Sequence, residues 1–207
     1  MIRALLISLC LTAAPTAPEP LVDVTTVVPD LVVDLRYATS DNFMKKQVYP
    51  SDARCLLLDR SAKQLGQAAT TLRAQGLRLK VYDCYRPHSV QYELWKIMPK
   101  PGYVADPRPG SNHNRGGAVD LTLVSTDGGV IEMPSGYDFF GPAAHHSFTG
   151  ASSEALRNRA RLLTAMEAAG FKKNPMEWWH YDLPGAARYP LRDQPFSAAD
   201  AGAPVHP

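Results

Sequence analysis

Two short segments of this 207-residue sequence carry residue types that bind metals and move protons. Residues 111–123 contain His113 and Asp120, and residues 177–181 read Glu-Trp-Trp-His-Tyr, with the histidine at position 180. A neutral imidazole and a carboxylate are suitable ligands for zinc. Two histidines and one aspartate leave a fourth position open, which is typical of a catalytic site, whereas structural zinc sites are closed by four ligands. The sequence therefore predicts a catalytic zinc site.

The first segment is predicted to bring its two ligands together. Residues 117–124 read as a strand in which alternate apolar residues enter a core, so that Asp120 faces the other way. Gly116 and Gly117 allow a sharp turn before this strand, which lets His113 fold back toward Asp120. An isolated histidine or aspartate in a strand is more often a structural, hydrogen-bonded residue. The presence of a second motif with matching ligand types favours the metal site.

The second segment is predicted to place a free carboxylate beside the metal. Glu177 is expected on a turn after Pro175, and His180 in a strand over residues 178–183. Because the turn breaks the strict alternation of a strand, both side chains can reach one metal ion.

Several regular elements are predicted around these segments. Apolar residues at helical spacing predict helices over residues 59–74, 89–97 and 154–169, the first and last closed by a glycine. Strands are predicted over residues 31–37, 77–82, 117–124 and 178–183. Strands and helices do not alternate regularly, so an α+β fold is favoured over a doubly wound sheet.

Length and composition limit the classes of protein. A chain of 22.7 kDa with 45% hydrophobic and 20% charged residues is expected to form one compact catalytic domain. The formal net charge is +2, and the basic residues form no run or stripe, so nucleic acid is not an expected partner. The sequence leaves the oligomeric state open.

The N-terminus has the pattern of a secretory signal peptide. Arg3 precedes a short apolar run that ends in the small residues Thr-Ala-Ala at positions 12–14. This run is too short for a stable membrane span. We expect a signal peptide over residues 1–14, a flexible lead-in over 15–30, a catalytic zinc-binding domain over 31–195 and a flexible tail over 196–207. An exported, periplasmic protein is thus predicted; the alternative is a frayed apolar terminus of a cytoplasmic protein.

Signal removal would leave two cysteines, Cys55 and Cys84. In an oxidising compartment such a pair is a candidate disulfide, whereas in the cytosol both would more often be small buried residues. The sequence alone does not choose between these alternatives.

The two ligand segments resemble the zinc D,D-peptidases of the peptidoglycan-cleaving family. The motifs are Ser-x-His-x-x-Gly-x-Ala-x-Asp at residues 111–120 and Glu-x-x-His at residues 177–180. Further stretches are similar to the D-alanyl-D-alanine dipeptidase branch, and the similarity extends from Asp34 to Asp193. The matching stretches are residues 34–43, 82–87, 102–105 and 137–139. The resemblance implies the hedgehog/D,D-peptidase type of α+β fold, a small central antiparallel sheet flanked by helices.

The resemblance also implies roles for individual residues. His113, Asp120 and His180 would hold one Zn²⁺ per chain, Glu177 would be the acid/base, and Arg86 would stabilise the transition state. Asp138 would bind the ammonium group of a free D-Ala-D-Ala substrate, in a pocket lined by Tyr37, Tyr49 and Ser111. The alternatives are a zinc D,D-carboxypeptidase acting on peptidoglycan stem peptides and a non-catalytic zinc-binding module. Glu177 and Arg86 argue against the module, because a structural metal site needs neither.

Overall fold

The computed structural model describes residues 19–197 and confirms the predicted α+β class. Its main sheet has five strands in the order β2-β4-β5-β7-β6. All neighbours are antiparallel except β2 and β4, which are parallel, so the sheet is mixed at one edge. The strands are β2 (Val32–Val33), β4 (Leu77–Asp83), β5 (Ala118–Ser125), β6 (Lys172–Asn174) and β7 (Glu177–Asp182). A separate antiparallel pair joins β1 (Leu21–Asp23) to β3 (Leu56–Leu58).

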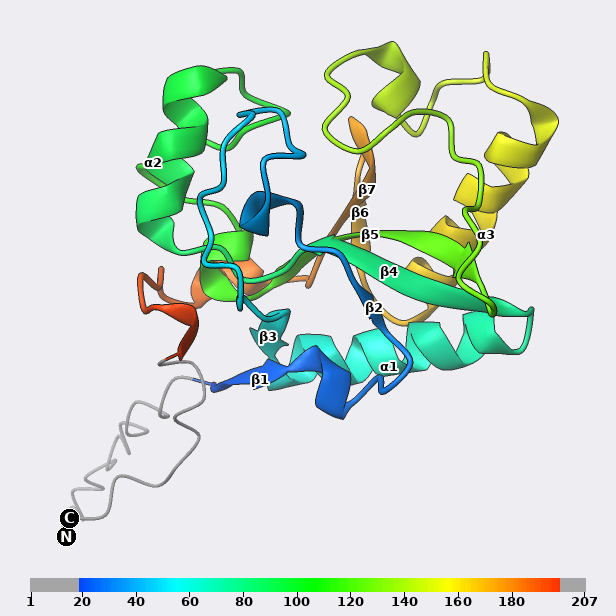
Figure 1. Ribbon diagram of the computed structural model, residues 1–207, viewed down its shortest axis with the longest axis horizontal. Helices are drawn as coiled ribbons and strands as arrows, with labels where there is room; N and C mark the ends of the chain where they lie inside the picture. Colours follow the sequence, from blue (N-terminus) through cyan, green and yellow to red (C-terminus); the bar gives the residue numbers. More distant parts are fainter. Residues whose placement is uncertain (1–18, 198–207) are drawn as a thin grey trace, which may run out of the picture.

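Helices α1 (Asp59–Arg73) and α3 (Ser153–Ala168) pack against one face of the sheet (Figure 1). Their apolar residues recur every three or four positions, so each helix presents one continuous stripe to the strands. The side chain of Ser152 caps α3 by accepting a hydrogen bond from the backbone N–H of Ala155. Helix α2 (His88–Ile97) lies at the end of the sheet (Figure 1). It is beside the loops that cover the face of the sheet opposite α1 and α3.

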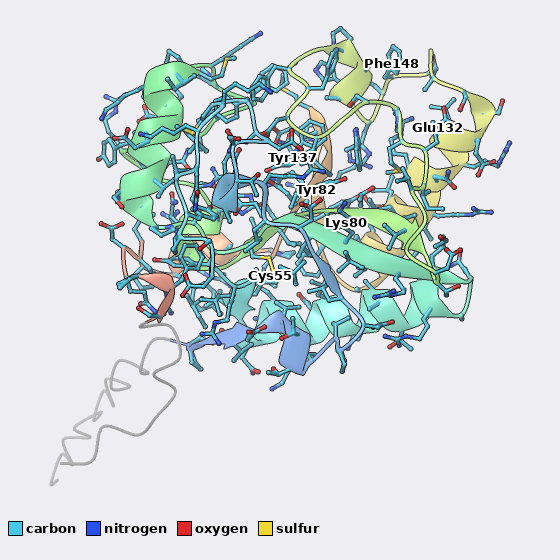
Figure 2. All side chains as sticks on the ribbon, viewed as in Figure 1. Cys55, Lys80, Tyr82, Glu132, Tyr137 and Phe148 are labelled. Atoms are coloured by element: carbon cyan, nitrogen blue, oxygen red, sulfur yellow. A yellow bond between two sulfur atoms is a disulfide. The ribbon has the colours of Figure 1, made fainter. Side chains whose placement is uncertain are left out.

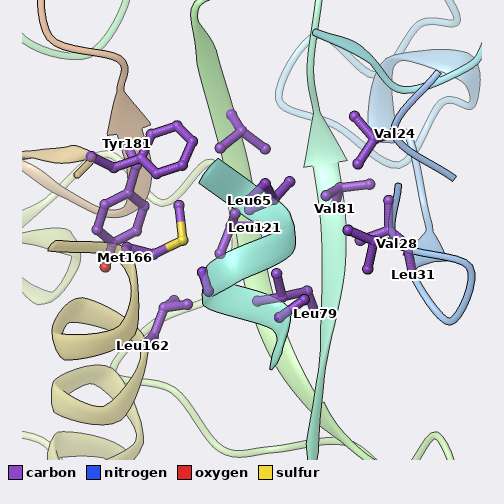
Figure 3. Packing of buried hydrophobic residues seen from close by; sticks show 14 of the residues in the cluster. Val24, Val28, Leu31, Leu65, Leu79, Val81, Leu121, Leu162, Met166 and Tyr181 are labelled. Carbon is purple, nitrogen blue, oxygen red and sulfur yellow. The ribbon is translucent and has the colours of Figure 1, made fainter. Parts of the chain in front are cut away.

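The larger core lies between these two helices and the sheet. Leu65 of α1 and Leu162 and Met166 of α3 pack in one cluster with Leu79 and Leu121 of the central strands (Figure 3). All five are fully or almost fully buried. Close packing of this kind holds the central strands rigidly, and one of them, β5, carries the predicted metal ligand Asp120.

Strand β5 separates apolar from polar side chains as predicted. Leu121 and its apolar neighbours two positions away enter the core with α1 and α3. Asp120 and Thr122 point to the opposite face, where loops cover them so that only 3–4% of each residue is exposed. The face of β5 that carries Asp120 is therefore polar and buried.

Two predicted boundaries differ from the structure. Residues 19–30 belong to the fold, because β1 pairs with β3 and Val24 and Val28 are buried in the main core. At the other end, Phe196 is 5% exposed and packs against Tyr49 and Tyr85. These contacts hold residues 19–30 and Phe196 against the domain, although the sequence predicted these residues to be flexible. The predicted signal peptide, residues 1–14, lies outside the described residues, as do residues 15–18 of the predicted lead-in and residues 198–207 of the predicted tail.

The structure joins Cys55 to Cys84 in a disulfide, and both residues are 1% exposed. The bond links the residue before β3 to the residue after β4. It therefore anchors the segment that leads from β4 to Arg86.

Within residues 19–197, none of the helices has the length and apolar character needed to cross a bilayer.

Candidate metal centre and active site

The register of the sheet places two of the predicted ligands side by side. Asp120 of β5 and His180 of β7 are direct partners across the antiparallel pair. Opposed residues share a face of the sheet and have neighbouring Cβ atoms. The Nδ1 atom of His180 lies 2.9 Å from Oδ1 of Asp120.

A turn before β5 brings in the third predicted ligand, His113. His113 begins a short 3-10 helix (His113–Arg115), and Gly116 follows it with a φ of 72°. Glycine adopts this left-handed backbone without strain, and a Cβ atom at this position would lie 2.3 Å from Cδ2 of Leu21. The Nε2 atom of His113 lies 3.3 Å from Oδ1 of Asp120 and 3.2 Å from Nδ1 of His180.

One atom of each predicted ligand faces the same point: Oδ1 of Asp120, Nδ1 of His180 and Nε2 of His113. Together these three atoms have the geometry of a metal site. All lie within 4.8 Å of one another. Zinc bonds of about 2.0–2.1 Å at tetrahedral angles would separate ligand atoms by about 3.3 Å, close to the observed 2.9, 3.2 and 3.3 Å. The donor set of two imidazoles and one carboxylate, buried on the sheet, fits a metal with an open coordination position.

Further hydrogen bonds orient two of the ligands. The Nδ1 atom of His113 lies 2.7 Å from the carbonyl oxygen of Cys84, which leaves Nε2 to face the metal position. The hydroxyl group of Tyr137 donates to Oδ2 of Asp120 at 3.0 Å. Figure 2 shows Tyr137 and Tyr82 on the face of the sheet opposite α1, and their rings stack 4.6 Å apart. Sequence reasoning missed the contact of His113 with the Cys84 carbonyl and that of Tyr137 with Asp120. The first has no sequence signal, because its acceptor is a backbone carbonyl.

Glu177 approaches the same point without joining the three ligands. It is the first residue of β7, and the pairing of β6 with β7 is irregular between Lys173 and Asn174. This irregularity allows residues three apart to converge: Oε2 of Glu177 lies 4.0 Å from Nδ1 of His180. The same oxygen accepts a hydrogen bond of 2.7 Å from Nδ2 of Asn174. Burial, together with the carboxylates of Asp120 and Asp138, raises the pKa of Glu177 to about 8.

Arg86 is held rigidly at the edge of the site. Its Nε and Nη2 atoms donate to Oδ2 of Asp83 at 3.0 and 2.6 Å, and Nη1 donates to Oε1 of Gln91 at 2.8 Å. Its guanidinium carbon lies 5.3 Å from the ring centre of Tyr37. Asp83 and Gln91 are fully buried, so these contacts fix the guanidinium group with little freedom to rotate.

One cavity of about 240 Å³ connects these groups. Its lining includes the side chains of His113, Asp120 and His180 and six other polar or charged residues: Tyr37, Arg86, Ser111, Asp138, Glu177 and Asp182. A volume of this size suits a small molecule, and the candidate metal ligands and the other polar groups all face this one cavity.

Asp138 lies in the cavity wall in an unusual backbone conformation. Its φ is 56°, a left-handed value that aspartate tolerates better than most residues. Its two carboxylate oxygens each lie 3.3 Å from the hydroxyl group of Tyr37, and the backbone N–H of Phe43 donates to Oδ2 at 3.4 Å. Burial and the nearby Asp120 carboxylate raise the pKa of Asp138 to about 7. The raised pKa means that ionising Asp138 costs free energy in this environment, and a cationic ligand beside the carboxylate would offset that cost.

The structure differs from the predicted substrate pocket at one residue. Tyr49 does not line the cavity; it is 2% exposed, and its hydroxyl group donates to Oδ1 of Asp83 at 2.8 Å. Tyr49 therefore contacts Asp83, the ion-pair partner of Arg86, and helps to hold that carboxylate in place. Ser111 does line the cavity, and its hydroxyl oxygen also accepts a hydrogen bond from the backbone N–H of His113. Packing of the Tyr49 ring against Tyr37 and Phe196 turns it away from the cavity.

The fold and this arrangement of groups define a metal-dependent hydrolase, in which a His-Asp-His group is accompanied by an unbound carboxylate and an arginine. Residues 18–200 match the family Peptidase_M15, described as D-ala-D-ala dipeptidase, and the chain belongs to this peptidase family. A D-alanyl-D-alanine dipeptidase of Escherichia coli (strain K12) is 41% identical over 177 residues, which cover 86% of this chain and 91% of the relative. A D-alanyl-D-alanine dipeptidase of Enterococcus faecium is 33% identical, covering 79% of this chain and 87% of that protein.

Proposed function

We propose that this protein is a zinc-dependent dipeptidase that hydrolyses free D-Ala-D-Ala to two molecules of D-alanine. One observation carries the proposal: the His113, Asp120 and His180 group shares a single small cavity with Glu177, Arg86 and Asp138. The names of the relatives and of the family support the choice of substrate. The side-chain chemistry of the metal group supports zinc.

Each group has a distinct task in this mechanism. His113, Asp120 and His180 would hold the zinc ion, which when bound would supply Lewis-acid chemistry: a lowered pKa for water and polarisation of a carbonyl group. Burial and nearby carboxylates raise the pKa of Glu177, and a bound cation would favour its ionised form. In that form Glu177 accepts a proton from the attacking water and later delivers it to the leaving amine, which requires a carboxylate that is close to the metal ligands but not one of them. Arg86 donates hydrogen bonds to the oxyanion that develops on the scissile carbonyl oxygen. Because Asp83 and Gln91 already hold the guanidinium group, little reorganisation is needed at that step.

The proposed function is tested by incubating purified, zinc-loaded protein with D-Ala-D-Ala and measuring the release of free D-alanine. Release that stops when a chelator removes zinc, and resumes when zinc is returned, is the expected result. Faster cleavage of an N-acylated stem pentapeptide than of the free dipeptide would instead indicate a D,D-carboxypeptidase. Full zinc binding with no hydrolysis of either substrate would indicate the non-catalytic module.

Replacing Asp138 with asparagine is expected to reduce kcat/KM for free D-Ala-D-Ala by about 30-fold or more. Loss of one partner of a buried, charge-assisted pair costs roughly 2 to 5 kcal/mol, and the substrate ammonium would lose its carboxylate. Asparagine also tolerates the left-handed backbone at this position, so the variant isolates the charge. The measurement is kcat/KM for both the free and the N-acetylated dipeptide, at equal zinc content.

The N-acetylated dipeptide is the control for the Asp138 variant. It has no ammonium group, so its slow hydrolysis should scarcely change. If the substitution slows both substrates equally, the cause is general damage to the cavity. If the free dipeptide is unaffected, another group recognises the ammonium and the preference for a dipeptide loses its main support.

We further propose that the protein is exported to the periplasm, where salvage of released dipeptide is the physiological role. The buried Cys55–Cys84 disulfide supports this location, because such bonds persist in oxidising compartments. Protein expressed with its N-terminal segment in a bacterium is expected in the periplasmic fraction, cleaved near residue 14. After denaturation without reductant, it should take up no thiol label, since cleavage removes Cys10. Two labelled thiols, or an uncleaved chain in the cytosol, would contradict the proposal.

A further inference from the structure

Asp182, the last residue of β7, contacts the metal ligand His180 on the side away from the metal position. His180 and Asp182 are two residues apart in β7, so their side chains lie on the same face of the sheet. Oδ1 of Asp182 lies 3.1 Å from Nε2 of His180, while Nδ1 of the same ring faces Asp120 and His113. A neutral imidazole has one donor and one acceptor nitrogen. Donation from Nε2–H to Asp182 leaves the lone pair on Nδ1 for the metal.

The same oxygen of Asp182 joins both ligand segments. It accepts a second hydrogen bond, of 2.9 Å, from Nδ2 of Asn112, the residue before His113. The backbone supports this junction, because Gly117 donates to the carbonyl of Asn112 and accepts from the N–H of Leu183. One carboxylate oxygen therefore restrains two chain segments that are far apart in the sequence and each carry a metal ligand.

The two histidine ligands have different outer partners. His113 is bonded to a neutral backbone carbonyl, that of Cys84, whereas His180 is bonded to a carboxylate. An acceptor on the outer nitrogen fixes ring orientation, and a negatively charged one also makes the imidazole a stronger donor to the metal. The His180 side chain is 13% exposed and that of Asp182 is 28% exposed, so the contact is partly shielded from water.

We propose that Asp182 is a positioning residue that sets the metal affinity of this site through His180, with Asn112 holding the carboxylate in place. The proposal rests on the zinc-dependent function proposed above and deepens it. Asp182 also lines the cavity, so direct contact with the substrate is the competing role. The two roles predict different measurements.

The test is the zinc dissociation constant of the full-length protein, measured by competition with a fluorescent chelator. Asp182→Ala is expected to weaken zinc binding by about 10- to 100-fold. Asp182→Asn keeps an acceptor of the same shape but removes the charge, so its zinc affinity should lie between those of Asp182→Ala and the wild type. Asp127→Asn is the matched control, because Asp127 lies in an exposed turn after β5 and contacts Ser125 and Gly129; its affinity should equal that of the wild type.

KM for D-Ala-D-Ala at saturating zinc separates positioning from substrate contact. A positioning role leaves KM unchanged once zinc is bound, and the asparagine variant partly rescues affinity. A raised KM with unaltered zinc affinity would overturn the proposal in favour of substrate contact. Wild-type affinity in Asp182→Ala would overturn it as well, while leaving the zinc function intact. Wild-type protein that binds no zinc would overturn both.

Discussion

Replacing Glu177 with glutamine is expected to lower kcat for D-Ala-D-Ala by about 10²- to 10⁴-fold, the usual contribution of a positioned acid/base. The amide preserves the shape of the side chain, but it cannot accept the proton of the attacking water. Zinc content should stay at one ion per chain, since Glu177 stands apart from the three ligand atoms. The measurement is steady-state kinetics combined with metal analysis of the same preparation.

Glu167→Gln provides the matched control for this variant. Glu167 is an exposed residue near the end of α3 that pairs with Lys173, so the same chemical change there should leave kcat unaltered. Near-normal turnover in Glu177→Gln would assign the acid/base to a different group. Loss of zinc together with activity would show that Glu177 contributes to metal binding.

Replacing Arg86 with lysine is expected to reduce kcat by about 10²- to 10³-fold, the usual effect of removing one donor to a developing oxyanion. Lysine keeps a positive charge but cannot reproduce the planar fork that contacts Asp83 and Gln91 together. The variant should therefore also lose stability, because Asp83 is fully buried and its ion pair is disturbed. Kinetics should be measured well below the melting temperature of the variant.

Gln91→Ala separates positioning of Arg86 from loss of its charge. This change removes one contact to the guanidinium group and leaves the pair with Asp83 intact. Activity should fall much less than in Arg86→Lys. Equal losses in the two variants would show that orientation, rather than the guanidinium donor itself, dominates. An Arg86→Lys enzyme with normal kcat would exclude the proposed role of Arg86.

The sequence determined the α+β class, the principal helices and strands, and the three residues that the structure brings together as a candidate metal group. These depend on local properties: alternation along β5, apolar spacing along α1 and α3, and the glycines before β5. Short elements such as β1, β3 and β6 were missed, because three residues carry too little periodicity to predict a strand.

Tertiary structure alone decided how the groups cooperate. Strand register opposed Asp120 to His180, and an irregular β6–β7 pair turned Glu177 toward them. Tyr49 illustrates the limit of the family resemblance: the resemblance implied a place in the pocket wall, but packing turned the hydroxyl group of Tyr49 toward Asp83. Asp182, Tyr137 and the Cys84 carbonyl contact the ligands across long sequence separations. Such contacts depend on the three-dimensional path of the chain, because hydrogen bonding requires proximity in space and residue type specifies only donors and acceptors.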